Sequence, residues 1–153
     1  MSILRWKSSS TVLAVIDRLE RVLLCRIHGE SPWQPIKARV IPLRPSRFSA
    51  IRVVDPIFSH WFLAATPVVG RFVPVPERDG HARLMRIFIT RRDRMSPISL
   101  RARAHASLDA DYVWHPLSDV EDEDFDVYPR ELGPFLRGYL EGWIPDGVIT
   151  LVE

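Results

Sequence analysis

The stretch over residues 11–27, TVLAVIDRLERVLLCRI, decides the fold of this chain. It holds two short apolar runs, residues 11–16 and 22–27, and the polar segment 17–21 joins them. Short runs rich in β-branched and apolar residues, bounded by polar turn residues, are typical of buried strands. The stretch therefore predicts a β-hairpin near the beginning of the chain.

Outward from this hairpin, further strands are expected in residues 63–75, 81–91, 110–117 and 148–152. Residues 129–142 fit a helix because their apolar side chains recur at helical spacing: Leu132, Phe135, Leu136, Tyr139 and Leu140. Pro129 suits the first turn of this helix and Gly142 its end. The pattern predicts a β-rich domain with a late helix, an α+β arrangement.

Residues 34–62 are the hardest segment to interpret, because four prolines interrupt them. The prolines limit any helix to residues 46–54, and Ser46 is a candidate cap for it. A second short helix or turn is expected near residues 116–120, with Ser118 as its cap.

Length and composition set the class of protein. The chain has 153 residues, which is the size of one domain, and it is 46% hydrophobic, which supplies a core. Its longest apolar runs are too short for a transmembrane helix, and its N-terminus lacks the apolar core of a signal peptide. We expect a cytoplasmic protein with no membrane partner. Cys25 cannot form an internal disulfide, since it is the single cysteine.

Charge is segregated along the chain. Of the 21 basic residues, 19 are arginines, whose planar forks bind phosphate or carboxylate. Residues 37–52 carry five cations and no anion, whereas residues 119–126 carry six acids and no base. This pattern is compatible with a basic face for phosphate-rich ligands, or with solvated faces in a protein whose genome favours arginine codons.

Four segments, taken in order, resemble the Nudix hydrolase superfamily. They are the hairpin at residues 12–26, the sequence SPWQ at 31–34, the strand ending at 86–89, and DYVWHPLSDV at 111–120. The resemblance covers residues 10–140. It implies an α+β fold, a Nudix-like mixed β-sheet sandwich with helices, over residues 10–140, with residues 141–153 as a tail packed on the same domain.

The catalytic box of that family carries several glutamates on a helix, which hold Mg²⁺ or Mn²⁺ against a diphosphate. Counted from Trp33, the box falls on residues 38–59, and Arg52 matches its arginine. Other residue types occupy the positions that carry the chemistry: Ala38, Arg44, Val53, Pro56, Ile57 and Ser59. The resemblance therefore implies a degenerate box without catalytic residues or metal ligands. Gradual divergence and a local frameshift both explain it.

The first functional hypothesis is a Nudix-fold protein that lacks pyrophosphohydrolase activity. It would serve as a binding or regulatory module for a nucleotide or another phosphate-bearing ligand, with no cofactor. The candidate ligand-binding residues are Trp33, Arg39, Arg44 and Arg52.

Two alternatives remain open. A divergent hydrolase could cleave a nucleoside diphosphate linked to another moiety, with Mg or Mn held by acids outside the box: Glu77, Asp79, Asp109 or Asp111. An RNA-binding module could instead use the arginines of the basic segment: Arg39, Arg44, Arg47 and Arg52. The five histidines show no zinc-ligand spacing.

Overall fold

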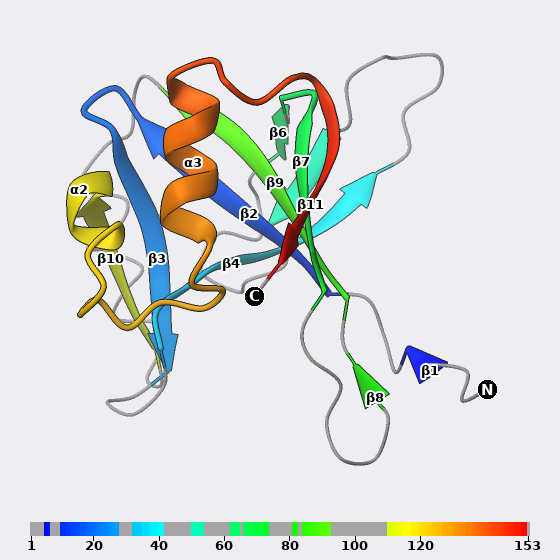
Figure 1. Ribbon diagram of the computed structural model, residues 1–153, viewed down its shortest axis with the longest axis horizontal. Coiled ribbons are helices and arrows are strands. Elements are labelled where there is room, and N and C mark those ends of the chain that lie inside the picture. Colours follow the sequence, from blue (N-terminus) through cyan, green and yellow to red (C-terminus); the bar gives the residue numbers. More distant parts are fainter. Residues whose placement is uncertain are drawn as a thin grey trace.

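The computed structural model describes residues 5–6, 10–27, 32–41, 50–53, 62–64, 66–73, 81–82, 84–92 and 110–152. These residues form strands and two helices (Figure 1). The strands are β1 Arg5–Trp6, β2 Ser10–Asp17, β3 Arg21–Ile27, β4 Gln34–Ile41, β5 Ala50–Val53, β6 Phe62–Ala64, β7 Val68–Val73, β8 His81–Ala82, β9 Met85–Arg92, β10 Ala110–Pro116 and β11 Gly147–Val152. The helices are α2 Leu117–Val120 and α3 Leu132–Leu140.

One mixed sheet of nine strands organises the described chain. Its order is β11-β7-β9-β2-β3-β4-β5-β6, and β10 pairs with β3 beside this path. β2 pairs in parallel with β9 along its whole length, and antiparallel with β3 and β4. The antiparallel pairing of β2 with β3 around the turn after Asp17 confirms the predicted hairpin. β1 and β8 form a separate parallel pair.

The expected α+β Nudix-like sandwich with helices is wrong. The described chain is mostly strand, and its two helices contain four and nine residues. The helix expected over residues 46–54 is also wrong where the structure describes that segment, because residues 50–53 form β5. Ile51 and Val53 are β-branched residues, which fit a pleated sheet better than a helix.

Both faces of the sheet bury apolar side chains. Val12, Ala14 and Ile16 of β2 belong to a first cluster, which includes residues of α2 and α3, and Leu13 and Val15 belong to a second cluster on the other face. All five are at most 3% exposed. Because successive strand residues point to opposite faces, β2 is a central strand with a core on each side.

Helix α3 covers the face of the first cluster (Figure 1). It confirms the late helix, within narrower bounds than expected. Leu132, Phe135 and Leu136 are buried against the sheet. Phe135 lies over Gly70 of β7, where an added Cβ would be 2.9 Å from the Phe135 Cζ. The glycine therefore allows the helix to approach the sheet closely.

Helix α2 lies beside β3 and β10 and begins differently from the expectation (Figure 1). Its N-cap is Pro116, with no side-chain hydrogen bond at the cap, so the expected capping by Ser118 is wrong. Ser118 lies inside the helix, where its hydroxyl cannot act as an N-cap.

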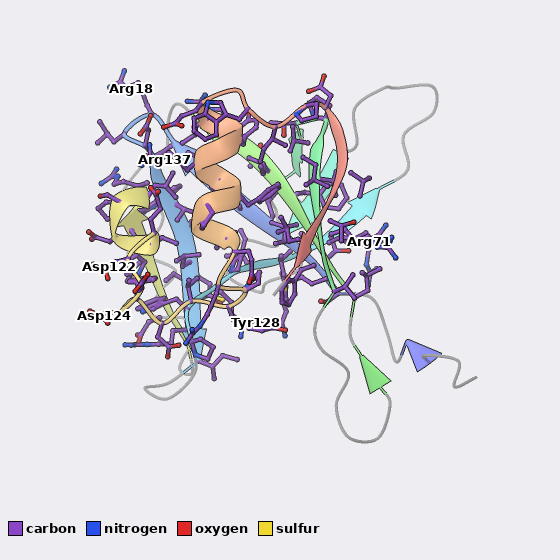
Figure 2. All side chains as sticks on the ribbon, viewed as in Figure 1. Arg18, Arg71, Asp122, Asp124, Tyr128 and Arg137 are labelled. Atoms are coloured by element: carbon purple, nitrogen blue, oxygen red, sulfur yellow. The ribbon has the colours of Figure 1, made fainter. Side chains whose placement is uncertain are left out.

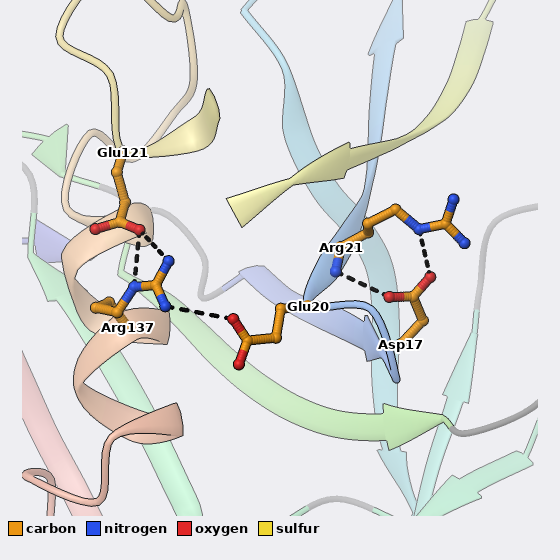
Figure 3. A network of polar contacts seen from close by, with 5 residues as sticks. All are labelled: Asp17, Glu20, Arg21, Glu121 and Arg137. Atoms are coloured by element: carbon orange, nitrogen blue, oxygen red, sulfur yellow. Dashed lines mark hydrogen bonds and ion pairs between the residues drawn. The ribbon is translucent and has the colours of Figure 1, made fainter. Parts of the chain in front are cut away.

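A polar network joins α3, α2 and the hairpin turn (Figure 3). The Arg137 Nε donates to the Glu121 Oε1 over 2.8 Å, and the Arg137 Nη1 lies 3.4 Å from the Glu20 Oε2. Within the hairpin, the carboxylate of Asp17 accepts from the Arg21 Nε over 2.7 Å and from the Arg21 backbone N–H over 2.8 Å. These bonds fix the turn and connect it to the helical layer. Neither helix in the described segments is long and apolar enough to cross a membrane.

The close approach at Gly70 gives a stability prediction. Gly70→Ala should lower the free energy of unfolding by about 1–3 kcal/mol, because the new methyl group displaces the Phe135 ring. Urea denaturation measures this change. The control is the same substitution in a Phe135→Leu background, where the smaller side chain should reduce the cost. An equal cost in both backgrounds would show that Phe135 is not the cause.

Candidate functional site

Strands β4 and β5 bring two of the four candidate ligand-binding residues together. Arg39 and Arg52 are paired in register across this antiparallel ladder. Like charges directly opposite each other destabilise a strand pair. A bound anion would remove that cost. Arg44 and Arg47 lie outside the described residues.

The alternation of β4 explains why its cations reach solvent. Ile36 and Ala38 are buried in the second cluster, whereas Lys37 and Arg39 are exposed on the other face of the strand. Within the described part of the chain, Arg39 has no ion-pair partner. This strand therefore displays two exposed positive charges two residues apart.

The structure places Trp33 away from the two arginines. It precedes Arg39 by six residues along an extended strand, which corresponds to about 20 Å. The backbone N–H of Trp33 donates to the Asp126 carbonyl over 2.8 Å, and the Tyr128 N–H donates to the Trp33 carbonyl over 2.9 Å. These two backbone hydrogen bonds connect the beginning of β4 to residues 126–128, which follow α2. Of the described candidates, Trp33 therefore does not form one compact site with Arg39 and Arg52.

Trp33 belongs to a cluster that sequence reasoning missed. The guanidinium carbon of Arg26 lies 4.5 Å from the centroid of the Trp33 ring, a cation–π contact. The His115 ring lies 4.5 Å from the Trp33 ring in an edge-on arrangement and 5.0 Å from the Phe125 ring. The separate segments carry no shared motif. The alternation of residues in β3 and β10 is the signal that could have indicated this cluster. It does so only when the register between the two strands is known.

This cluster leaves hydrogen-bonding groups unused. Among the described residues, the buried Nε of Arg26 and the buried Nε2 of His115 have no hydrogen-bond partner. The Arg26 Nη2 lies 3.8 Å from the Asp111 Oδ2, which is long for an ion pair. Burial lowers the pKa of His115. The positive charge of Arg26 also lowers this pKa, whereas the negative charge of Asp119 raises it, and the net shift is downward. The histidine is therefore held in its neutral form at neutral pH.

Acidic side chains do not gather into a metal site in the described segments. No group of three or more His, Cys, Asp or Glu residues is placed to hold an ion there. Of the four acids in the hydrolase alternative, the described residues include Asp111, which lies beside Arg26. Glu77, Asp79 and Asp109 lie outside them.

Comparison with known proteins gives no match to any family model and none to any curated protein sequence. The relationship to the Nudix superfamily therefore stays a prediction that rests on the quoted residues.

The environment of His115 predicts a pH dependence of stability. The unfolded chain binds a proton near the ordinary histidine pKa of 6.5, whereas the folded chain does so only at lower pH. The contribution of neutral His115 to the free energy of unfolding should therefore be fully present above pH 6.5. It should be lost as the pH falls through the lowered pKa of the folded state.

Urea denaturation at about pH 7.5 and about pH 5 compares the native protein with His115→Gln. We expect the native protein to lose more free energy of unfolding on acidification than the variant. Equal losses in the two proteins would contradict the assignment of this titration to His115.

Proposed function

We propose that this protein is a binding module for a nucleotide or another phosphate-bearing ligand, and that it does not cleave pyrophosphate bonds. The observation that carries the proposal is the register pair of Arg39 and Arg52. Register pairing places one arginine on each of two neighbouring strands, and the planar fork of arginine is the side chain best suited to bind phosphate.

The charge around this pair supports an anionic ligand. Lys37 is exposed on the same face of β4 as Arg39, and the ladder from Ala38↔Val53 to Ile41↔Ala50 contains no acid. Binding of a phosphate near these cations relieves their mutual repulsion, so part of the binding free energy comes from the loss of that repulsion.

The same ladder supports the absence of hydrolysis. Two box positions at which the Nudix family has glycine and glutamate are occupied by Ala38 and Val53, which are paired with each other in β4 and β5. A strand pair of apolar residues has no carboxylate oxygens for Mg²⁺ or Mn²⁺. No observation in the described residues favours the hydrolase alternative.

Calorimetric titration with ADP and with inorganic pyrophosphate at low salt tests the proposal. Arg39→Gln and Arg52→Gln should each weaken binding by roughly tenfold or more, because each removes a charge-assisted contact. Arg18→Gln is the matched control, since it removes one exposed arginine in the hairpin turn and should leave the affinity unchanged.

Two results would overturn the proposal. One is Mg²⁺-dependent release of AMP from ADP by the purified protein, which would establish hydrolysis. The other is undiminished affinity in both variants, which would show that the arginine pair does not contact the ligand.

A further inference from the structure

A second pair of arginines faces solvent on another part of the sheet. Arg71 of β7 and Arg86 of β9 are directly opposite in an antiparallel ladder. Arg86 is also in register with Thr11 of β2, and Arg71 is in register with Thr150 of β11. These four residues, here named the arginine row, form one line across four adjacent strands.

The arginine row is open to solvent. Arg71, Arg86 and Thr150 are exposed, and Thr11 is half-buried. Strands are spaced at about 4.8 Å, so the row extends over about 14 Å with both guanidinium groups in its middle. A ligand lying across the strands would therefore meet a hydroxyl, two guanidinium groups and a second hydroxyl in succession.

Arg71 and Arg86 have no counter-charge among the described residues. In the segments that the structure describes, neither forms an ion pair or a hydrogen bond with a side chain. The same-face positions two residues away along the four strands are apolar where they are described: Leu13, Phe88, Val69, Val148 and Val73. Among the described residues, these neighbouring positions therefore supply no carboxylate to neutralise the row.

The acidic residues Asp122 and Asp124 lie far from Arg71 of the arginine row (Figure 2). Figure 2 shows Arg71 beside β11, whereas Asp122 and Asp124 lie next to α2 at the other side of the molecule. Two like charges directly opposite each other raise the free energy of the strand pair. This repulsion is relieved when an oxyanion binds between the guanidinium groups.

We infer that the arginine row is a second anion site, which binds phosphate groups of a polyphosphate or of a nucleic-acid backbone. Each guanidinium donates to phosphate oxygens, and the Thr11 and Thr150 hydroxyls donate to further oxygens at the two ends of the row. Tetrahedral phosphate suits this set because it accepts hydrogen bonds from several directions. The binding involves no covalent step.

This site is distinct from the pair Arg39–Arg52. Arg86 is on the same face of the sheet as Leu13, whereas Arg39 is on the face of Val12, by the alternation of β9, β2 and β4. The inference therefore does not depend on the proposed function, and substitutions at the two pairs test the two ideas separately.

The experiment measures binding of inorganic tripolyphosphate and of a single-stranded RNA oligonucleotide to the full chain, Arg71→Gln, Arg86→Gln and the control Arg18→Gln. Either substitution in the row should weaken binding by roughly tenfold or more, and the control should bind like the native protein. If RNA is bound, removal of one arginine should also reduce the slope of log affinity against log salt by about 0.7.

The two ligands distinguish the sources of phosphate. Tripolyphosphate binding that depends on the row supports a free polyphosphate or nucleotide ligand, and row-dependent binding of RNA alone supports a nucleic-acid backbone. Binding of neither ligand, or binding that both variants retain, overturns the inference.

A stability measurement separates binding from a structural role. In phosphate-free, low-salt buffer both variants should melt at the same temperature as the native protein or higher, because one of two repelling charges is gone. A lower melting temperature in both variants would mean that the arginines stabilise the fold, and it would overturn the inference.

Discussion

Burial of β2 on both faces is the constraint on which the rest of the structure depends. Its residues from Val12 to Ile16 are almost completely inaccessible, so each face of the sheet must be covered by other apolar groups. On one face this cover includes α2 and α3. On both edges β2 needs hydrogen-bonding partners, since unpaired buried backbone groups are costly. β9 supplies them on one side, and β3 and β4 supply them on the other. The central strand thereby sets the register of its neighbours.

That register also determines where positive charge appears. On β4, β7 and β9, residues such as Ile36, Phe72 and Ile87 are buried. Their chain neighbours Lys37, Arg71 and Arg86 are exposed, because successive strand residues point to opposite faces. A guanidinium group keeps its charge at any physiological pH, and its planar fork matches phosphate oxygens. Opposed arginines on adjacent strands are therefore a costly arrangement in the free protein and a favourable one around an oxyanion. This physical asymmetry underlies both binding proposals.

The helix expected over residues 46–54 is wrong at a particular segment, residues 50–53. Proline spacing permitted a helix over residues 46–54, and a catalytic box would have required one there. The β-branched residues Ile51 and Val53 instead pair with β4 in an antiparallel ladder. Local rules allowed either outcome, because a short apolar run fits a strand and a helix about equally well. Pairing with β4, the preceding strand, decided between the two structures. Ser118 shows the same limit, since its capping depended on where the preceding strand ended.

The sequence by itself determined the hairpin and α3, because alternation and helical spacing depend on residues close together in the chain. It also identified arginine as the dominant cation and Trp33 as a candidate. Only the tertiary structure decided that Arg39 is in register with Arg52 and Arg71 with Arg86. It also decided that Arg26 and His115 contact the ring of Trp33. The physical reason is that strand register is set by long-range packing against a common core. A shift of one residue would turn each of these side chains to the opposite face of the sheet.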